Sequence, residues 1–294
     1  MILPVPCGSQ APWPATGSTP FPGHTISPTP AKQPDTVVLK VALIGSGAIG
    51  SRVAELLDAG TAPGIELAGV VPHGKPRTGF SFEEAMDVAD VVVECAGVAA
   101  VAEFGPRSIS AGKDFLVTSI GALCEASLRK TLLDDGPGRT FLTTGALGGL
   151  DAITAASAGG TIYRITVESR KLPAALIQPW MDGETKESLL EATGPVELLR
   201  GGPAELIKAF PKSTNVVSAL ALAAGDWDVV EAVLIADPAA KQTTHHVLAE
   251  TSLGLFDSRV TNQASRGNPA SSALVPHAVV RGLRTLANAN GSFI

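Results

Sequence analysis

The sequence predicts an α/β fold, with a doubly wound parallel sheet followed by a second, α+β domain. Three observations carry this prediction. Short aliphatic runs alternate with stretches of helical spacing between residue 37 and about residue 150. A glycine-rich turn, Gly45-Ser46-Gly47-Ala48-Ile49-Gly50, joins the first aliphatic run to the first helical stretch. After Asp151 the pattern changes to segments in which apolar and polar residues alternate, as in strands with one solvated face.

Size and composition limit the classes of protein to consider. The chain has 294 residues, of which 45% are hydrophobic and 17% charged, as expected of an ordered globular protein. The formal net charge is −6, and no basic patch with interleaved aromatic residues occurs, so no nucleic-acid partner is expected. No apolar run has the ~20 residues that a membrane span needs, so no membrane association is expected.

The cysteines and the N-terminal segment together favour a cytoplasmic location. Cys7, Cys95 and Cys124 are scattered without C-x-x-C spacing, so neither a disulfide framework nor a metal site is expected. Residues 1–36 are rich in Pro, Gly and Ser and lack the apolar segment of a secretory signal. We interpret them as an extension that cannot bury enough apolar surface to form a core.

The first folded segment contains the predicted parallel sheet. Strands are predicted at residues 37–44, 65–71, 90–94, 115–118 and 140–143, and helices at 49–59, 98–111 and 125–134. Continuous Val, Leu and Ile runs connected by helices are typical of a parallel sheet covered on both faces. Ligands of such sheets bind beyond the carboxyl ends of the strands. The residues expected in that crevice are Ala96, Gly97, Ser119 and Ala146, together with the glycine turn.

The glycine turn has the spacing and the context of a dinucleotide-binding motif. Gly45 permits a tight strand-to-helix turn, Gly47 permits close approach of a pyrophosphate, and Gly50 permits close helix packing. The first helical residues, which include Ala48 and Ile49, offer unpaired N–H groups to the anion. The alternative is a merely structural turn. We predict a Rossmann-type domain that binds a nicotinamide cofactor.

The end of the second strand bears on which nicotinamide cofactor is used. A carboxylate that binds the ribose 2′-hydroxyl is expected about 20 residues after the glycine turn. The strand at 65–71 is instead followed by a loop without a carboxylate that contains Lys75 and Arg77. These cations suit a 2′-phosphate, which favours NADP or the use of both NADP and NAD; the alternative is that they are solvated loop charges.

The second half of the folded chain predicts an antiparallel or mixed sheet with helices. Strands are predicted at 160–170, 229–237 and 243–250, with a buried helix at 213–224. A final helix at 269–288 is expected to return to the first domain. The predicted domains are the extension at 1–36, a dinucleotide-binding domain at 37–150 plus 268–294, and an α+β substrate domain at 151–267.

Candidate acid–base residues for hydride-transfer chemistry lie on a strand of the second domain. His245 and His246 are neighbours there, so their side chains point to opposite faces and only one can reach a cleft. Taken alone, such a histidine is more often a packed or surface residue. The residues by themselves therefore do not decide its role.

Several ordered motifs resemble the L-aspartate dehydrogenase family, over roughly residues 38 to 290. The matching segments are the glycine turn, Val91 to Gly97, Thr144 to Asp151, Arg170-Lys171-Leu172-Pro173, Phe210-Pro211 with Thr214-Asn215-Val216, Ala236-Asp237-Pro238, Thr243-Thr244-His245 and Asn268-Pro269-Ala270-Ser271-Ser272. The resemblance places His245 on the catalytic histidine of the family. It places Ala146 and Asn215 on positions that contact the cofactor. Thr243 and Ala270 depart from the family, which has Asn and Lys at these positions.

The resemblance implies reversible oxidation of L-aspartate to iminosuccinate, which hydrolyses to oxaloacetate and ammonia, and a homodimer. Binding a dicarboxylate requires cationic side chains. Lys171 and Arg170 are the best-placed candidates, and Lys212 is a third. At least one of these three residues is expected to be only a surface charge.

Two other functions stay open. A semialdehyde dehydrogenase would use a cysteine nucleophile, for which Cys95 and Cys124 are near the crevice. A redox sensor that binds the dinucleotide without turnover would need a nucleic-acid-reading element, and none is apparent.

Overall fold

The computed structural model describes residues 38–73, 80–265, 268–290 and 292. The extension at 1–36 and the predicted cofactor-binding cations Lys75 and Arg77 lie outside the described residues. The side chains of Lys212 and of Ala270 lie outside them as well. No helix in the described part of the chain combines the length and the apolar character that crossing a membrane requires.

The first sheet is parallel throughout and has the strand order β2-β1-β3-β4-β5. Its strands are β1 (Leu39–Ile44), β2 (Ile65–Val71), β3 (Val91–Glu94), β4 (Asp114–Val117) and β5 (Thr140–Leu142). All five strands were predicted, within one or two residues at most ends. The continuous aliphatic runs are explained by burial on both faces.

Helices cover both faces of this sheet, so the doubly wound prediction is confirmed. Alternate residues of a strand point to opposite faces: Leu43 packs with α1 (Ala48–Asp58) and α9 (Val275–Ala287). Ile44 belongs to the cluster on the other face, which includes residues of the three remaining helices of this layer. These helices are α2 (Phe82–Val88), α3 (Val98–Ser110) and α4 (Ala126–Asp134).

The C-terminal helix returns to the first sheet as predicted, but it begins later than expected. Residues Asn268–Ser272 form strand β12, which pairs with β11 (Ala264–Ser265), and α9 starts only at Val275. The prediction of helix from residue 269 was therefore wrong over its first turn and a half. Ser272 accepts a hydrogen bond from the Leu274 backbone N–H, and Pro276 fits the first turn of a helix, where no N–H partner is needed.

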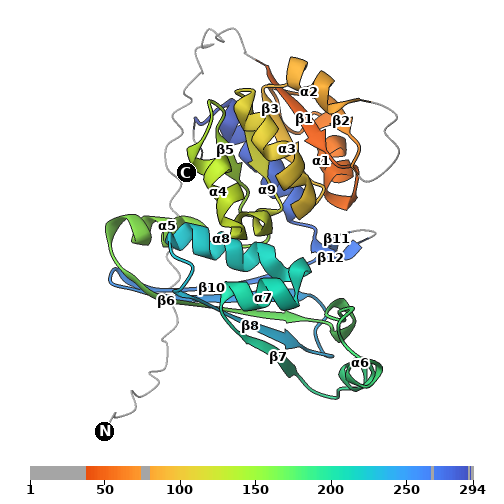
Figure 1. Cartoon of the computed structure of the whole chain (residues 1–294), viewed down its shortest axis with the longest axis vertical. Helices are drawn as coiled ribbons and strands as arrows, with labels where there is room; N and C mark the ends of the chain where they lie inside the picture. The colour runs from red at the N-terminus through yellow and green to blue at the C-terminus, as the bar shows by residue number, and fades with distance from the viewer. Residues whose placement is uncertain (1–37, 74–79, 266–267, 291, 293–294) are drawn as a thin grey trace, which may run out of the picture. The chain divides into compact units, whose positions relative to one another are not determined.

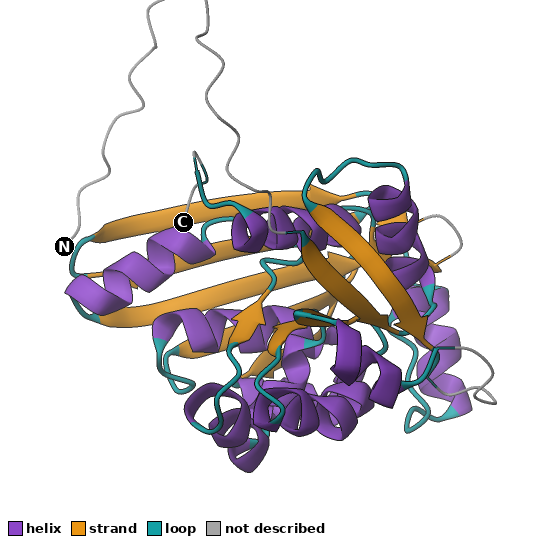
Figure 2. Cartoon of the chain, turned by 90° about the horizontal axis from the view of Figure 1, so that it is seen from above, coloured by secondary structure: helices purple, strands orange, loops and turns teal. Residues whose placement is uncertain are grey.

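The second sheet is mixed, with the order β10-β9-β6-β8-β7, as an α+β domain requires. Its strands are β6 (Ile162–Lys171), β7 (Val196–Gly201), β8 (Val230–Ala236), β9 (Thr243–Thr251) and β10 (Gly254–Asn262). Only β6 and β8 pair in parallel. Figure 1 shows α5 (Leu150–Gly159), α7 (Pro203–Ala209) and α8 (Thr214–Ala224) along one face of this sheet. Figure 2 shows the strands and helices of both sheets from a second direction.

Several elements were not predicted from the sequence. These are α2, α5, α6 (Gly183–Leu190), α7, β7, β10, β11, β12 and the short helices η1 (Ile120–Cys124), η2 (Pro173–Ala175) and η3 (Pro211–Ser213). For α2 a signal was present: Ser81 and Glu84 form a capping box, with reciprocal hydrogen bonds of 3.1 and 2.6 Å. Strand β10 exposes every second residue and carries few aliphatic ones, so its sequence resembles a loop.

Candidate active site

The glycine turn between β1 and α1 has the geometry that a pyrophosphate needs. Gly45 has φ +98°, and a Cβ there would lie 2.8 Å from the Cβ of Ala96. A Cβ at Gly50 would lie 2.0 Å from the Gly45 carbonyl oxygen. By contrast, Gly47, the N-cap of α1, faces open space and no side chain caps the helix. The turn thus leaves the first N–H groups of α1, at Ala48 and Ile49, free to bind an anion.

The loop after β3 borders the glycine turn, and the loop after β4 is hydrogen-bonded to Glu94 at the end of β3. Ala96 packs against Gly45, and Gly97 is the N-cap of α3 with φ +112°. Ser119 is buried and its hydroxyl donates a hydrogen bond to Glu94 Oε1 at 3.0 Å. The structure therefore places Ala96 and Gly97 beside the turn, whereas the Ser119 hydroxyl points inward.

Two contacts connect the segments after β4 and β5 with α8 and β10. Asn215, in the first turn of α8, accepts a hydrogen bond from the Gly121 N–H at 2.9 Å. The carbonyl oxygen of Ala146 accepts one from Asn262 Nδ2 at 3.1 Å. Asn262 is buried and no sequence signal singled it out. Both cofactor contacts implied by the family resemblance, Ala146 and Asn215, thus lie where the two sheets are joined.

His245 lies in β9, directly opposite Ser169 of β6, and is 5% exposed. Its Nδ1 lies 2.9 Å from Ser169 Oγ. Burial and, secondarily, the charge of Lys171 lower the pKa of His245 from 6.5 to about 4. The imidazole is therefore neutral at physiological pH and able to accept a proton.

Lys171 shares the sheet face of His245, because it lies two residues beyond Ser169 on the same strand. Its Nζ donates a hydrogen bond to Ser213 Oγ at 2.9 Å. Burial lowers the pKa of Lys171 to about 8, and among the described residues Lys171 forms no ion pair. A cation without a protein carboxylate partner beside a neutral histidine is suited to binding an anionic ligand.

Arg170 and His246 lie on the opposite face of the sheet. Arg170 Nε donates to Glu168 Oε1 at 2.7 Å, and Arg170 Nη1 lies 3.6 Å from Asp237 Oδ2. His246 Nε2 lies 2.8 Å from Asp257 Oδ1. The structure thus brings Lys171, and not Arg170, together with His245.

The two cysteines in the described part of the chain lack the features of a nucleophile. Cys95 is buried in the cluster beneath α1, and burial followed by the charge of Glu94 raises its pKa. Burial also raises the pKa of Cys124. Both thiols are therefore protonated at neutral pH, whereas the thiolate is the reactive form. Within the described ranges no group of three or more potential metal ligands occurs.

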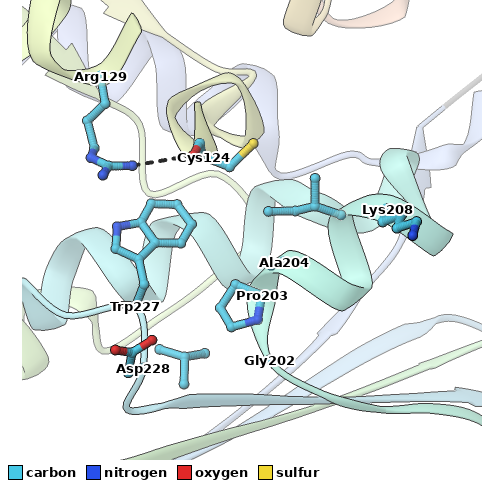
Figure 3. Close-up of a pocket in the computed structure, with 10 residues that line it drawn as sticks. Cys124, Arg129, Gly202, Pro203, Ala204, Lys208, Trp227 and Asp228 are labelled. Carbon is cyan, nitrogen blue, oxygen red and sulfur yellow. Dashed lines mark hydrogen bonds between the residues drawn. The ribbon is translucent and has the colours of Figure 1, made fainter. Parts of the chain in front are cut away.

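A cavity of about 530 Å³ lies apart from His245 and Lys171. It is lined by Cys124, Arg129, Gly202, Pro203, Ala204, Ile207, Lys208, Trp227, Asp228 and Val230. Figure 3 shows Arg129 above the indole of Trp227. The guanidinium carbon of Arg129 lies 4.9 Å from the ring centroid. The lining offers no histidine and is largely apolar, so this cavity lacks the acid–base pair that His245 and Lys171 form.

Comparison with known proteins gives the family. Residues 151–286 match the family model described as the C-terminal domain of aspartate dehydrogenase, and residues 45–137 match the NAD-binding domain of homoserine dehydrogenase. The L-aspartate dehydrogenase of Ruegeria pomeroyi is 34% identical over 84% of this chain and 92% of its own. That of Methanosarcina acetivorans is 30% identical over 85% and 98%.

A solved structure supports the same fold. The crystal structure of aspartate dehydrogenase from Thermotoga maritima has a TM-score of 0.67 and 24% identity, covering 87% of this chain and 98% of its own. Since residues 45–137 match an NAD-binding domain, the cofactor of this chain is a nicotinamide dinucleotide. The protein is an NAD(P)-dependent oxidoreductase, and the chain belongs to the L-aspartate dehydrogenase family.

Proposed function

We propose that this protein catalyses the reversible NAD(P)-dependent oxidation of L-aspartate to iminosuccinate, which hydrolyses to oxaloacetate and ammonia. The observation that carries the proposal is the placement of His245 and Lys171 on one sheet face. The start of α8 links that face to the cofactor loops, because Ser213 contacts Lys171 and Asn215 contacts Gly121. The activity of the relatives agrees with this chemistry.

Lys171 is proposed to bind a carboxylate of the substrate. Its ammonium group is half-buried and lacks an ion-pair partner in the described part of the chain. A charge-assisted hydrogen bond to a carboxylate would satisfy it in a partly desolvated site, where such bonds are strong. Arg170 is a weaker candidate, since it is already paired with Glu168 and Asp237.

His245 is proposed as the catalytic base. The tautomer in which Nδ1–H donates to Ser169 Oγ leaves Nε2 free to take a proton from the substrate amino group or from the attacking water. A carboxylate bound to Lys171 would offset the cationic charge that lowers the histidine pKa, which brings that pKa closer to the working pH. The nicotinamide, when bound, supplies the acceptor for the hydride that leaves the substrate Cα.

The proposed cofactor residues divide into two groups. The backbone around Gly45, Gly47 and Gly50, with the N–H groups of Ala48 and Ile49, would hold the pyrophosphate. Ala96, Gly97, Ser119, Ala146 and Asn215 would border the rest of the dinucleotide.

The preference for NADP, with use of both cofactors, rests on Lys75 and Arg77. Replacing both cations by Ala is expected to raise the KM for NADPH more than that for NADH. If the ratio of the KM values for NADPH and NADH is unchanged, Lys75 and Arg77 are solvated charges that do not contact the cofactor.

Three further properties remain proposals. They are the domain division at residues 37–150 plus 268–294 and 151–267, a homodimer, and a cytoplasmic location. The domain division is supported by the packing of α9 against α1 and β1, and the homodimer by the family resemblance.

The test of the function is an absorbance assay of nicotinamide oxidation. Oxaloacetate with ammonia, and then a panel of other 2-oxo acids, would be offered with NADH and NADPH separately. We expect oxaloacetate to be the preferred substrate, and aspartate to be oxidised in reverse. Preferred amination of a monocarboxylic 2-oxo acid, or no turnover with either cofactor, would contradict the proposal. The cysteine-dependent alternative is disfavoured because both described thiols are protonated.

A further inference from the structure

Glu94 is a fully buried carboxylate at the carboxyl end of β3, the central strand of the first sheet. It is 0% exposed, and in the part of the chain that the structure describes it has no ion pair with Lys or Arg. Burying an ionised carboxylate is unfavourable unless hydrogen bonds replace its water. The residue therefore needs an explanation that hydrophobic packing does not give.

The two oxygens of Glu94 are occupied by donors from two different loops. Oε1 accepts from the N–H groups of Ala96 and Gly97, at 2.6 Å each, in the loop that follows β3. Oε2 accepts from the N–H groups of Ser119 at 2.9 Å and Thr118 at 3.3 Å, in the loop that follows β4. The Ser119 hydroxyl donates to Oε1 at 3.0 Å, so the loop after β4 also contacts the oxygen that binds the loop after β3.

Both loops continue directly to the cofactor crevice. The first packs Ala96 against Gly45 of the glycine turn. The second leads from Ser119 to Gly121, whose N–H is bonded to Asn215 of the second sheet's helix layer. Glu94 thus binds the loops after β3 and β4. The first of these loops packs against the glycine turn, and the second is bonded to α8.

We propose that Glu94 is a positioning residue for the dinucleotide, which fixes the loop after β3 to the loop after β4. The proposal rests on the proposed function only in that the cofactor is a nicotinamide dinucleotide.

Two substitutions separate fixing the loops together from merely capping one of them. Glu94→Gln keeps one carbonyl oxygen, so it can accept from the N–H groups of one loop only, and its NH2 group opposes the N–H groups of the other loop. Glu94→Asp retains the charge and, like other Asp side chains, can bond N–H groups two residues further on. It is one methylene too short to keep the bonds to Thr118 and Ser119 as well. Glu125→Gln is the matched control, because Glu125 accepts from the N–H groups of Ser127 and Leu128 and from the Ser127 hydroxyl at the start of α4.

The readout is the dissociation constant for NADPH and for NADH, measured by the fluorescence of the reduced nicotinamide without substrate. Each variant is measured at a temperature well below its own Tm, so that loss of stability does not enter. We expect both Glu94 variants to bind at least about tenfold more weakly, the scale of losing one or more hydrogen bonds to a charged group. Glu125→Gln should lower Tm and leave both constants within twofold.

The outcomes that overturn the proposal are defined for each variant. Folded Glu94→Gln with constants within twofold of the parent would show that the carboxylate is only structural. Wild-type affinity in Glu94→Asp would show that capping the first loop suffices. If neither variant folds, Thr118→Val decides, because it removes only the hydroxyl that donates to the Glu94 carbonyl at 2.6 Å and lies 3.4 Å from Oε2. Severalfold weaker cofactor binding supports the proposal, and unchanged binding refutes it. Failure of the proposed function would be seen separately, as absence of aspartate turnover in a parent protein that binds the cofactor.

Discussion

Replacing Lys171 by Met tests the site most directly, because activity and stability are expected to move in opposite directions. Met has a similar length and no charge, so the substitution removes the ammonium group and keeps most of the packing. The proposed carboxylate contact is lost, which lowers activity. The unfavourable burial of a cation is lost too, which raises the free energy of unfolding.

The magnitudes follow from the surroundings of Lys171. Hydrogen bonds to charged groups contribute about 1.5–3 kcal/mol, so kcat/KM for aspartate is expected to fall roughly 10- to 150-fold. The pKa of Lys171 is lowered from 10.5 to about 8, which corresponds to at most about 3 kcal/mol of instability below pH 8. Partial exposure reduces this to about 1–2 kcal/mol.

The pH profile of kcat/KM, which reports the free enzyme, supplies an independent check. In the parent, His245 must be neutral and Lys171 charged, so activity is expected to fall below about pH 4 and above about pH 8. The Met variant should lose the alkaline limb. Its acid limb should move upward, because the Lys171 charge contributes to the lowered histidine pKa. Arg170→Met is the comparison from the opposite face.

Three results would refute this reasoning. The first is a Met variant with parental kcat/KM. The second is a Met variant whose urea or thermal midpoint lies below that of the parent. The third is a larger loss of kcat/KM in Arg170→Met than in Lys171→Met, which would show that the substrate binds on the opposite face of the sheet.

His245→Ala should reduce kcat about 10²- to 10⁴-fold, while the affinity for the cofactor stays near parental. His246→Ala should reduce kcat only slightly. Equal losses of kcat in both variants would show that His245 was wrongly chosen over His246. The neutral burial of His245 also makes stability pH-dependent. Its folded pKa of about 4 lies below its ordinary value of 6.5, so about 3 kcal/mol is present above pH 6.5 and lost as the pH falls to 4. Unfolding midpoints across this range should fall less in His245→Ala than in the parent. Replacing Cys95 and Cys124 together by Ala should leave kcat/KM within a few-fold; a loss of more than about a thousandfold in folded protein would indicate a nucleophile.

The fold was predicted from sequence where local pattern and tertiary environment agree. Aliphatic runs such as Val91-Val92-Val93 become strands because both of their faces are buried. The glycine turn was predictable because its conformation demands Gly45. Strand β10 and the strand at Asn268–Ser272 were missed, since pairing with a neighbouring strand stabilises them and their own residues indicate little.

The candidate site was predictable in part. Strand alternation showed that only one of His245 and His246 can face the cleft, but choosing between them required the family resemblance. The same alternation separates Lys171 from Arg170, yet the register of β6 against β9 is needed to know which one shares the face of His245. Glu94 gave no signal, because a glutamate after three valines does not reveal that its acceptors face two loops.

The position of α9 in the first layer has a consequence for how the protein is made. Val279 and Leu283 pack with Val41 and Leu43, so the part of this face that α1 does not cover stays exposed until almost the whole chain has been synthesised. At 5–20 residues per second, the wait between β1 and α9 is roughly 10 to 50 seconds. During that time apolar strands are exposed in an incomplete chain, which is when chaperones bind and when aggregation competes with folding. A ribosome that stops before residue 275 therefore releases a product without a closed cofactor domain, and cellular proteases are expected to remove it.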